Sequence, residues 1–285
     1  MAETILITGT SSGIGYGTAK AFIKAGYRVI ATVRNNEDAK RLKLEMGENL
    51  HPIICDVTNA EQVVALAQYV KSISENGLLH GLINNAGIEM VDPAELQSMD
   101  DIRSQFETNV FGLIAVTKAL LPLLGTDSNT KGHAGRIINV SSVGGVLALP
   151  FLSGYAATKF AVEGYSHSLR RELQLFGIKV VIIGAGAVKS EIWKKDKLDS
   201  KFYKGTAYET PFAKLKTMMQ TAEIGAKTEV EAGEFILKTY RTKSPKPRYA
   251  FTPNKFFNWI LPSMLSHKLV DGLLNSMLAL KSPKK

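Results

Sequence analysis

The sequence has little cysteine and no long uninterrupted hydrophobic run. Cys55 is the only cysteine among 285 residues, so no internal disulfide can form, which is typical of proteins in a reducing cytoplasm. No apolar stretch reaches the roughly 20 residues that span a bilayer. The N-terminus also lacks the basic segment and apolar run of a secretory signal. We therefore expect a cytoplasmic protein.

The patterns of several functional classes are missing as well. The five histidines show no spacing typical of metal ligands, so we expect no metal site. No serine stands in the G-x-S-x-G turn of an acyl hydrolase. No recognised nucleic-acid-binding motif is present, so we expect no nucleic-acid partner.

Acidic residues are scarce only in the last third of the chain. Up to Val188 there are 16 Lys and Arg against 17 Asp and Glu, whereas from Lys189 onward there are 19 against 9. The C-terminal third therefore carries the whole net charge of +9. A solvated Lys-rich surface accounts for this excess. The sharper alternative is a site for an anionic partner, such as a phosphorylated substrate, an acyl thioester or a membrane face.

Short β-rich runs alternate with longer helical segments along the chain. Their Val, Ile and Leu content indicates a parallel sheet that is buried on both faces. We therefore predict an α/β fold, a single Rossmann-type domain with a doubly wound sheet over residues 1–250 and a basic, apolar helical extension over 251–285. The expected strands are 4–7, 28–33, 51–55, 81–83, 136–140 and 179–183.

A glycine-rich turn follows the first expected strand, where residues 8–15 read T-G-T-S-S-G-I-G. Glycines at this place permit a tight turn and a close approach of the backbone to a pyrophosphate, which then lies at the N-terminus of the next helix. The strand–turn–helix setting favours a dinucleotide site over a purely structural turn.

The end of the second strand indicates which dinucleotide is bound. An acidic residue there would hold the ribose hydroxyls of NAD, but the sequence has Val33 and Arg34. Arg34 suits a 2′-phosphate, with Ser11 or Ser12 as an added donor. The alternative is a solvated arginine at a strand end. We predict that NADP(H) is preferred over NAD(H).

Tyr155 and Lys159 are four residues apart in the stretch Y-A-A-T-K. On a helix they would lie on one face, one turn apart. An ammonium group near a phenol favours the phenolate and lowers the pKa of the phenol from about 10. The pair can therefore serve in acid–base catalysis, although two unrelated surface side chains can have the same spacing.

Together these motifs resemble those of the short-chain dehydrogenase/reductase family in its non-extended form. The glycine turn, N-N-A-G at 84–87, Asn109, Ser142 and Y-x-x-x-K at 155–159 stand in the family's order over roughly residues 4–190. The stretch G-R-I-I-N-V-S-S-V-G-G at 135–145 is most similar to the branch of 17β-hydroxysteroid and retinol dehydrogenases.

The resemblance implies cofactor contacts beyond the glycine turn. Two residues after the third strand would flank the adenine, three after the fourth would lie near the nicotinamide ribose, and one after the sixth would meet the carboxamide. The family usually has Pro-Gly where this chain has Ala185 and Gly186. The expected cofactor-binding residues are Gly9, Ser11, Ser12, Gly13, Ile14, Gly15, Arg34, Asp56, Val57, Asn85, Ala86, Gly87, Tyr155, Lys159 and Val188.

The resemblance also implies a catalytic set of Asn109, Ser142, Tyr155 and Lys159. Tyr155 would exchange a proton with the substrate oxygen, and Lys159 with the positive nicotinamide would lower its pKa. Ser142 would donate a hydrogen bond to that oxygen. Asn109 would hold water behind Lys159, or else bond to backbone within its helix.

Two segments are expected to set specificity. The family's substrate lid falls here at about 190–227, with a helix that Thr210 and Pro211 would begin. Farther on, an apolar stripe from Met264 to Leu278 predicts an amphipathic C-terminal helix. This helix would pack on the body or a partner subunit, or contact a membrane. The expected apolar face of the lid helix comprises Phe212, Leu215, Met218 and Met219, which would be core or pocket lining.

We therefore expect an NADP(H)-dependent oxidoreductase that interconverts a secondary alcohol and a ketone on a hydrophobic substrate, such as a steroid, a retinoid or a long-chain carbonyl compound. A 3-oxoacyl thioester reductase is the alternative enzyme, favoured by the basic C-terminal third. A non-catalytic dinucleotide sensor or scaffold is the alternative of another class, although it would not need the catalytic set. A homodimer or homotetramer is implied by the resemblance.

Overall fold

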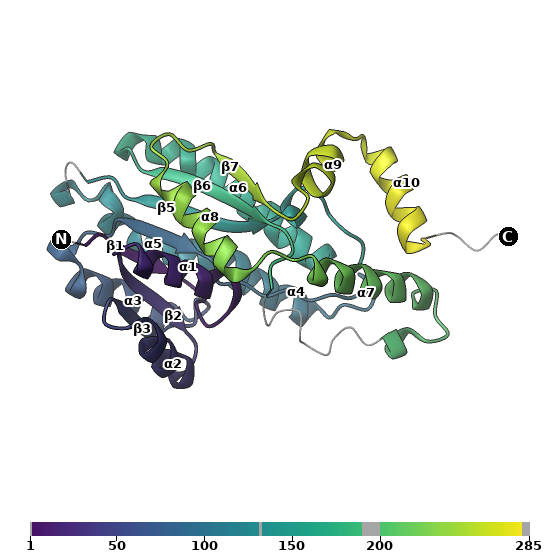
Figure 1. The fold of residues 1–285 in the computed structure, drawn as a ribbon, viewed down its shortest axis with the longest axis horizontal. Coiled ribbons are helices and arrows are strands. Elements are labelled where there is room, and N and C mark those ends of the chain that lie inside the picture. Colours follow the sequence, from purple (N-terminus) through teal and green to yellow (C-terminus); the bar gives the residue numbers. More distant parts are fainter. Residues whose placement is uncertain (1, 131–132, 190–199, 281–285) are drawn as a thin grey trace.

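The strands form one parallel sheet in the order β3-β2-β1-β4-β5-β6-β7 (Figure 1). The computed structural model describes residues 2–130, 133–189 and 200–280. The chain crosses over between β1 and β4, and such a switch point places the ligand crevice at the carboxyl ends of the strands. The predicted doubly wound Rossmann-type fold is confirmed. The strands are β1 Thr4–Ile7, β2 Arg28–Val33, β3 Leu50–Ile54, β4 Gly81–Asn84, β5 Arg136–Ser142, β6 Lys179–Ala185 and β7 Arg248–Phe251.

Helices cover both faces of the sheet. α1, α2 and α8 pack on one face, and α3, α5 and α6 on the other. α7, α9 and α10 lie together beyond the sheet, away from both layers (Figure 1). The helices are α1 Gly13–Lys24, α2 Asn36–Met46, α3 Ala60–Ile73, α4 Met99–Phe106, α5 Leu113–Leu121, α6 Ser153–Glu172, α7 Glu209–Ile224, α8 Glu229–Arg241, α9 Leu261–Met264 and α10 His267–Leu278.

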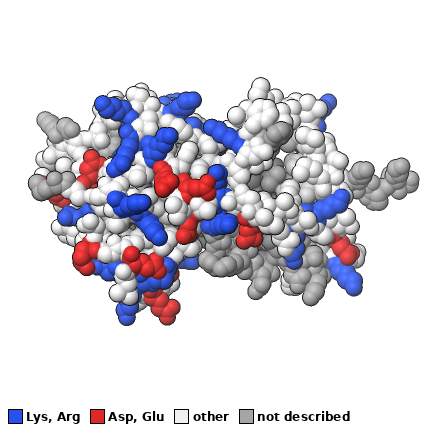
Figure 2. Space-filling view, viewed as in Figure 1, with Lys and Arg blue, Asp and Glu red and all other residues white. Residues whose placement is uncertain are grey.

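Charges of both signs are mixed on the surface. On the face shown in Figure 2, Lys and Arg side chains alternate with Asp and Glu over the sheet and its helices. The surface over α9 and α10 is largely uncharged in the same view.

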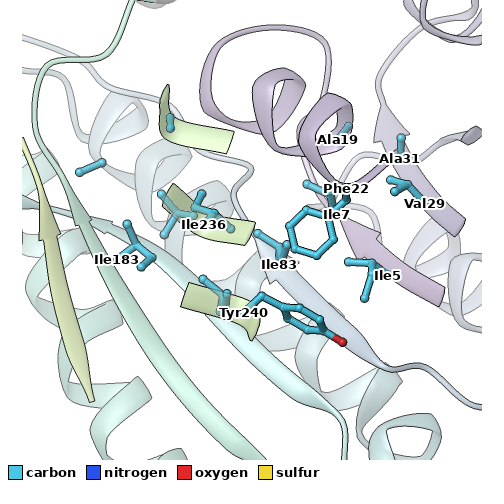
Figure 3. Close-up of a cluster of buried hydrophobic side chains, with 14 of the residues drawn as sticks. Ile5, Ile7, Ala19, Phe22, Val29, Ala31, Ile83, Ile183, Ile236 and Tyr240 are labelled. Carbon is cyan, nitrogen blue, oxygen red and sulfur yellow. The ribbon is translucent and has the colours of Figure 1, made fainter. Parts of the chain in front are cut away.

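Alternate residues of each strand serve two separate cores. Ile5 and Ile7 of β1 are fully buried with Phe22 of α1 on one face (Figure 3). Leu6, between them, points to the other face and packs with Leu120 of α5. This follows from the two-residue period of a strand. Burial of each such side chain stabilises the fold by about 1.5–3 kcal/mol. Packing against these strand residues therefore holds a helix layer on each face of the sheet.

The helix that carries Asn109 is irregular. The π-helical segment Glu107–Gly112 joins α4 to α5, and a second one, Pro122–Thr126, follows α5. Together Met99–Thr126 is long and apolar enough to cross a membrane, by length and composition alone. Its buried side chains, such as Val116, pack against the sheet. The segment therefore serves as a core helix of this fold.

The C-terminal third differs from the prediction in two ways. β7 is not among the predicted strands, because its sequence R-Y-A-F is short, begins with a charge and lacks a Val or Ile run. The predicted C-terminal helix occurs as α10, but Met264 and Leu265, the first residues of its apolar stripe, lie outside it. Leu265 ends α9 in an extended conformation, and α10 begins at His267.

The lid helix α7 begins at Glu209, with Tyr208 as its N-cap residue, whereas the prediction has Thr210 as the N-cap residue and Pro211 as the first helical residue. Pro211 is tolerated in the first turn because its missing N–H would have no partner within the helix. The buried side chains of Phe212 and Leu215 pack with Leu278 of α10. This part of the predicted stripe is core, and α10 packs on the lid helix. Residues 190–199, the first part of the predicted lid, lie outside the described residues.

Candidate active site

A cavity of about 1660 Å³ opens at the carboxyl ends of the strands. Residues that follow all seven strands contribute to its wall, together with residues of α6, α7, α9 and α10. Nearly every residue predicted for the cofactor or for catalysis lines this one cavity. The exceptions among them are Gly15 and Asn109, which lie behind the wall.

The turn after β1 needs its glycines. Gly9 has a φ of +68°, and a Cβ there would lie 2.8 Å from the Cα of Ala86. A Cβ on Gly15 would lie 2.1 Å from the carbonyl oxygen of Gly9. Ser12, the N-cap residue of α1, makes no side-chain capping bond. The Ser12 side chain therefore does not occupy the first N–H groups of α1, and such groups at a helix N-terminus can bind an anion.

The loops after β1 and β4 are joined by hydrogen bonds. The hydroxyl oxygen of Thr8 accepts from the N–H groups of Asn85 and Ala86 at 2.9 and 3.0 Å. The side-chain amide of Asn85 donates to the carbonyl oxygens of Thr8 and Gly9. Asn85 therefore holds the glycine turn in place, besides lining the cavity itself.

Two arginines stand beside the glycine turn. Arg34, which is predicted to bind a 2′-phosphate, is exposed and lines the cavity. Arg41 of α2 lines it too, and its guanidinium donates to the carbonyl oxygen of Ser11 at 2.7 Å and to Asp38 at 2.8 Å. Sequence reasoning missed Arg41, because it considered only the residues at the end of the second strand, and Arg41 lies farther on, in α2.

The residues predicted for the adenine and the carboxamide also line the cavity. The carboxylate of Asp56 accepts two hydrogen bonds from Thr58, at 2.9 and 2.8 Å, which fix its orientation. Val57 is buried next to the cavity. Val188 forms a parallel β-bridge with Lys227, which holds the chain after β6 against the start of α8.

Ser142, Tyr155 and Lys159 come together in one part of the wall. Ser142 ends β5, and its hydroxyl oxygen accepts from the N–H of Gly144 at 3.0 Å. Tyr155 and Lys159 lie one turn apart in α6, with the ammonium nitrogen 5.6 Å from the centre of the phenol ring. The ammonium donates to the carbonyl oxygen of Val140 at 3.2 Å. The ammonium of Lys159, the phenol of Tyr155 and the hydroxyl of Ser142 thus line the same part of the cavity.

The protein alone does not lower the pKa of Tyr155. Burial raises the pKa of the phenol and nearby Glu89 raises it further, while hydrogen bonding with Ser142 lowers it. The expected lowering, which needs the positive nicotinamide together with Lys159, stays a prediction, because in the protein alone desolvation outweighs the favourable contacts. Burial lowers the pKa of Lys159 to about 8, against the effect of Glu89 and Glu163. Tyr155 is accordingly a protonated phenol near neutral pH.

Asn109 is buried in the π-helical segment, behind the cavity. Its amide nitrogen donates to the carbonyl oxygen of Ile88 at 2.9 Å and to the hydroxyl of Thr158 at 3.0 Å, and its oxygen accepts from the N–H of Ile88 at 2.8 Å. The side chain thus bonds to the backbone of the loop after β4. Water binding behind Lys159 stays a prediction.

A buried ion pair lies behind Ser142 and was not predicted. The Nε of Arg248 donates to both carboxylate oxygens of Glu163, at 3.1 and 2.9 Å. Its Nη2 donates to the carbonyl oxygen of Ser142 at 3.2 Å, and the guanidinium stacks 3.9 Å from the ring centre of Trp259. Arg248 of β7 therefore connects Trp259, in the C-terminal extension, to Ser142 at the end of β5.

Much of the rest of the wall is apolar, although Ser104, Glu107, Thr221 and Asn258 also line it. Met218 and Met219 of α7 line the cavity, as do Leu273, Leu274 and Met277 of α10. The lid stripe thus serves both predicted roles, since its first half is core and its second half lines the pocket. The C-terminal helix also contributes to the pocket, a role that its apolar period alone did not indicate.

Comparison with known proteins agrees with this geometry. Residues 3–201 match the short chain dehydrogenase family. The chain is 34% identical over 269 residues to the NADPH-dependent 3-dehydrocapnine reductase of Ornithobacterium rhinotracheale, with 94% of each chain covered. It is 38% identical over 199 residues to retinol dehydrogenase 16 of Homo sapiens, covering 70% of this chain and 61% of that one.

Among solved structures, a short-chain dehydrogenase from Streptomyces avermitilis has a TM-score of 0.77 at 29% identity. The match covers 98% of this chain and 97% of that one. The predicted similarity to the hydroxysteroid and retinol dehydrogenase branch is consistent with these relatives. The chain therefore belongs to the short-chain dehydrogenase/reductase family and is an oxidoreductase.

Proposed function

We propose that the protein interconverts a secondary alcohol and a ketone on a hydrophobic substrate, with NADP(H) preferred over NAD(H). The observation that carries this proposal is the convergence of Ser142, Tyr155 and Lys159 on a cavity with two chemically different ends. One end has the glycine turn and an uncapped helix N-terminus, which fit a dinucleotide. The other end is lined by apolar side chains of α7 and α10.

The mechanism follows from the positions of three side chains. A nicotinamide dinucleotide held at the glycine turn would supply or accept the hydride at the substrate carbon. The Ser142 hydroxyl orients the substrate oxygen through a hydrogen bond, and Tyr155 gives its proton to that oxygen during reduction or takes it during oxidation. The ammonium of Lys159 stabilises the phenolate that reduction leaves behind.

A panel of carbonyl compounds with NADPH tests the proposal. Steroids, retinoids, aliphatic ketones and 3-oxoacyl thioesters are offered to the purified protein, and the loss of NADPH absorbance is recorded. We expect turnover of an apolar ketone. Turnover confined to thioesters would favour the alternative enzyme. Tight NADPH binding with no turnover of any compound would favour a non-catalytic sensor.

The cofactor preference is expected to depend on both arginines beside the glycine turn. Arg34→Ala and Arg41→Ala should each weaken NADPH binding by about tenfold, because a charge-assisted hydrogen bond to phosphate contributes about 1.5 kcal/mol or more. NADH binding should change by less than about twofold. Titration of both cofactors measures the ratio. Lys40→Ala, which removes an exposed cation of α2 outside the cavity wall, is the matched control. An unchanged ratio in both arginine variants would rule out this assignment.

The rate of reduction is expected to fall in alkaline solution. The pKa of Lys159 is lowered to about 8, so its stabilising charge is present below that pH and is lost above it. The value of kcat/KM for NADPH reports the free enzyme. It should be level up to about pH 8 and then fall about tenfold per pH unit. In Lys159→Arg the charge persists, so the remaining activity should not show this fall. A wild-type profile that stays level to pH 10 would contradict the assignment.

We propose a cytoplasmic protein, in a homo-oligomer, that touches membranes at its periphery. Support comes from α9 and α10, where Met264 is 78% exposed and Leu269, Leu273 and Met277 are more than half exposed. Leu273 and Met277 also line the cavity, so apolar surface continues from the outside into the site. Such a surface suits a substrate dissolved in lipid. Sedimentation with lipid vesicles, and light scattering for the oligomer, test these two points.

A further inference from the structure

The residue four positions before Tyr155 has an unusual backbone conformation. Phe151 has a φ of +69°, in the left-handed region that a bulky residue adopts only under strain. It lies in the turn directly before Leu152, the N-cap residue of α6. Its neighbours Leu149 and Leu152 line the cavity together with Tyr155. The strained residue therefore lies directly before the helix that carries the phenol.

The ring of Phe151 packs on the lid. It meets Phe212 of α7 edge-on, with ring centres 5.7 Å apart, and Tyr208 with ring centres 6.3 Å apart. Phe212 is fully buried and in turn packs on Tyr203, with ring centres 4.2 Å apart. These side chains belong to one buried cluster, the lid core, in which Phe151 alone precedes β6 within the described part of the chain. The lid core comprises Phe151, Tyr203, Phe212, Leu215, Met219 and Leu278.

The loop after β4 holds the same turn through its backbone. The N–H of Asp92 donates to the carbonyl oxygen of Phe151 at 2.9 Å. The carboxylate of Asp92 accepts from the hydroxyl of Tyr203 at 2.8 Å, so one residue binds both the turn and the lid. Gly154, in the first turn of α6, lies so close to Gln97 that an added Cβ would be 2.7 Å from the side-chain oxygen. The first turn of α6 therefore has little room to shift while these contacts are in place.

We propose that Phe151 is a positioning residue, through which the packing of the lid helix α7 sets the placement of Tyr155. The inference rests on the proposed function. A phenylalanine at this φ persists only while surrounding contacts compensate for its strain. When Phe212 packs on the ring, the turn before α6 keeps its conformation and the phenol stays aligned with the substrate oxygen. The lid therefore contributes to the chemical step as well as to substrate binding.

Phe212→Leu tests this coupling, because it weakens the packing on Phe151 and leaves α6 unchanged. The values of kcat and KM are measured with saturating NADPH for a small aliphatic ketone and for a long-chain ketone. The variant should lower kcat for both ketones by roughly 10- to 100-fold, as expected when a catalytic group is slightly misplaced. A lid that only binds substrate would instead raise KM for the long-chain ketone and leave kcat for the small one unchanged. That result would overturn the inference.

Phe22→Leu is the matched control, because Phe22 of α1 is also fully buried but belongs to the core of the sheet. It removes the same atoms and should leave kcat unchanged. Hydrogen exchange gives a second readout that needs no substrate. Local opening depends on local contacts, so amides of residues 152–162 should exchange about tenfold faster in Phe212→Leu and at the wild-type rate in Phe22→Leu.

Unchanged exchange in Phe212→Leu would show that the lid does not hold the start of α6, and the inference would fail. A wild type that reduces no ketone would overturn the proposed function itself. In that case hydrogen exchange still decides whether lid packing fixes the first turn of α6.

Two substitutions at Phe151 test the strain itself. Phe151→Ala and Phe151→Gly both remove the ring, but only glycine adopts a positive φ without strain. The glycine variant should therefore unfold at a higher urea concentration than the alanine variant, the reverse of the usual order. Both should lower kcat as Phe212→Leu does. An alanine variant that is at least as stable as the glycine variant would show that the turn is not left-handed in solution, which contradicts the proposed role.

Discussion

Replacing Tyr155 by phenylalanine is expected to lower turnover by about 10²- to 10⁴-fold, the usual contribution of a general acid or base. The change removes only the hydroxyl. The ring keeps its place in α6 beside Gly144, where an added Cβ would lie 3.6 Å from the ring, so the fold should survive. NADPH affinity should stay within about twofold of the wild type. Steady-state kinetics and cofactor titration separate the two effects.

Three neighbouring variants make this test sharper. Ser142→Ala should mainly lower the rate, whereas Ser141→Ala should be mild, because the buried Ser141 hydroxyl has no hydrogen-bond partner among the described residues. Lys159→Ala should lower turnover and weaken NADPH binding together, since it has two proposed roles. A Tyr155→Phe protein that reduces its substrate at nearly the wild-type rate would end the acid–base assignment.

Much of the framework could be predicted from local pattern. The six predicted strands all occur, and their observed ends differ from the predicted ones by at most two residues, because each is a short apolar run beside a turn. The common location of Ser142 and the glycine turn could be predicted as well, since the carboxyl ends of parallel strands lie at one edge of a sheet. The spacing of Tyr155 and Lys159 likewise fixed their common face on α6.

The parts that escaped prediction depend on contacts between distant residues. In the protein alone burial raises the pKa of Tyr155, and burial is a property of the packed site rather than of the Y-x-x-x-K spacing. The sequence around Glu89 does not reveal that it lines the cavity with Tyr155 and Lys159. Its loop is held by hydrogen bonds from the N–H groups of Ile88 and Met90 to Asn109 and Gln105, which come from a distant helix. Arg248 and Glu163 are 85 residues apart, and β7 has no apolar run to reveal it.

Removing the side chain of Arg248 is expected to destabilise the protein by about 3–5 kcal/mol, the usual cost of breaking a buried ion pair. The side chain of Glu163 is only 9% exposed, so Arg248→Ala leaves its charge buried without a partner. Glu163→Ala should cost a similar amount. Gly184 leaves the room that the guanidinium occupies, since a Cβ there would overlap Arg248. Urea unfolding of the single variants measures these losses.

The double variant Glu163→Leu with Arg248→Met separates stability from positioning. Well-packed apolar replacements of a buried ion pair are often neutral, so this variant should regain most of the lost stability, and a double-mutant cycle gives the coupling energy. Turnover should nevertheless stay low, because Arg248 also holds the carbonyl of Ser142 and stacks on Trp259. The loss should appear in kcat more than in NADPH affinity. Single variants that unfold at the wild-type urea concentration would show that the ion pair contributes nothing, and a fully active double variant would show that Arg248 does not position Ser142.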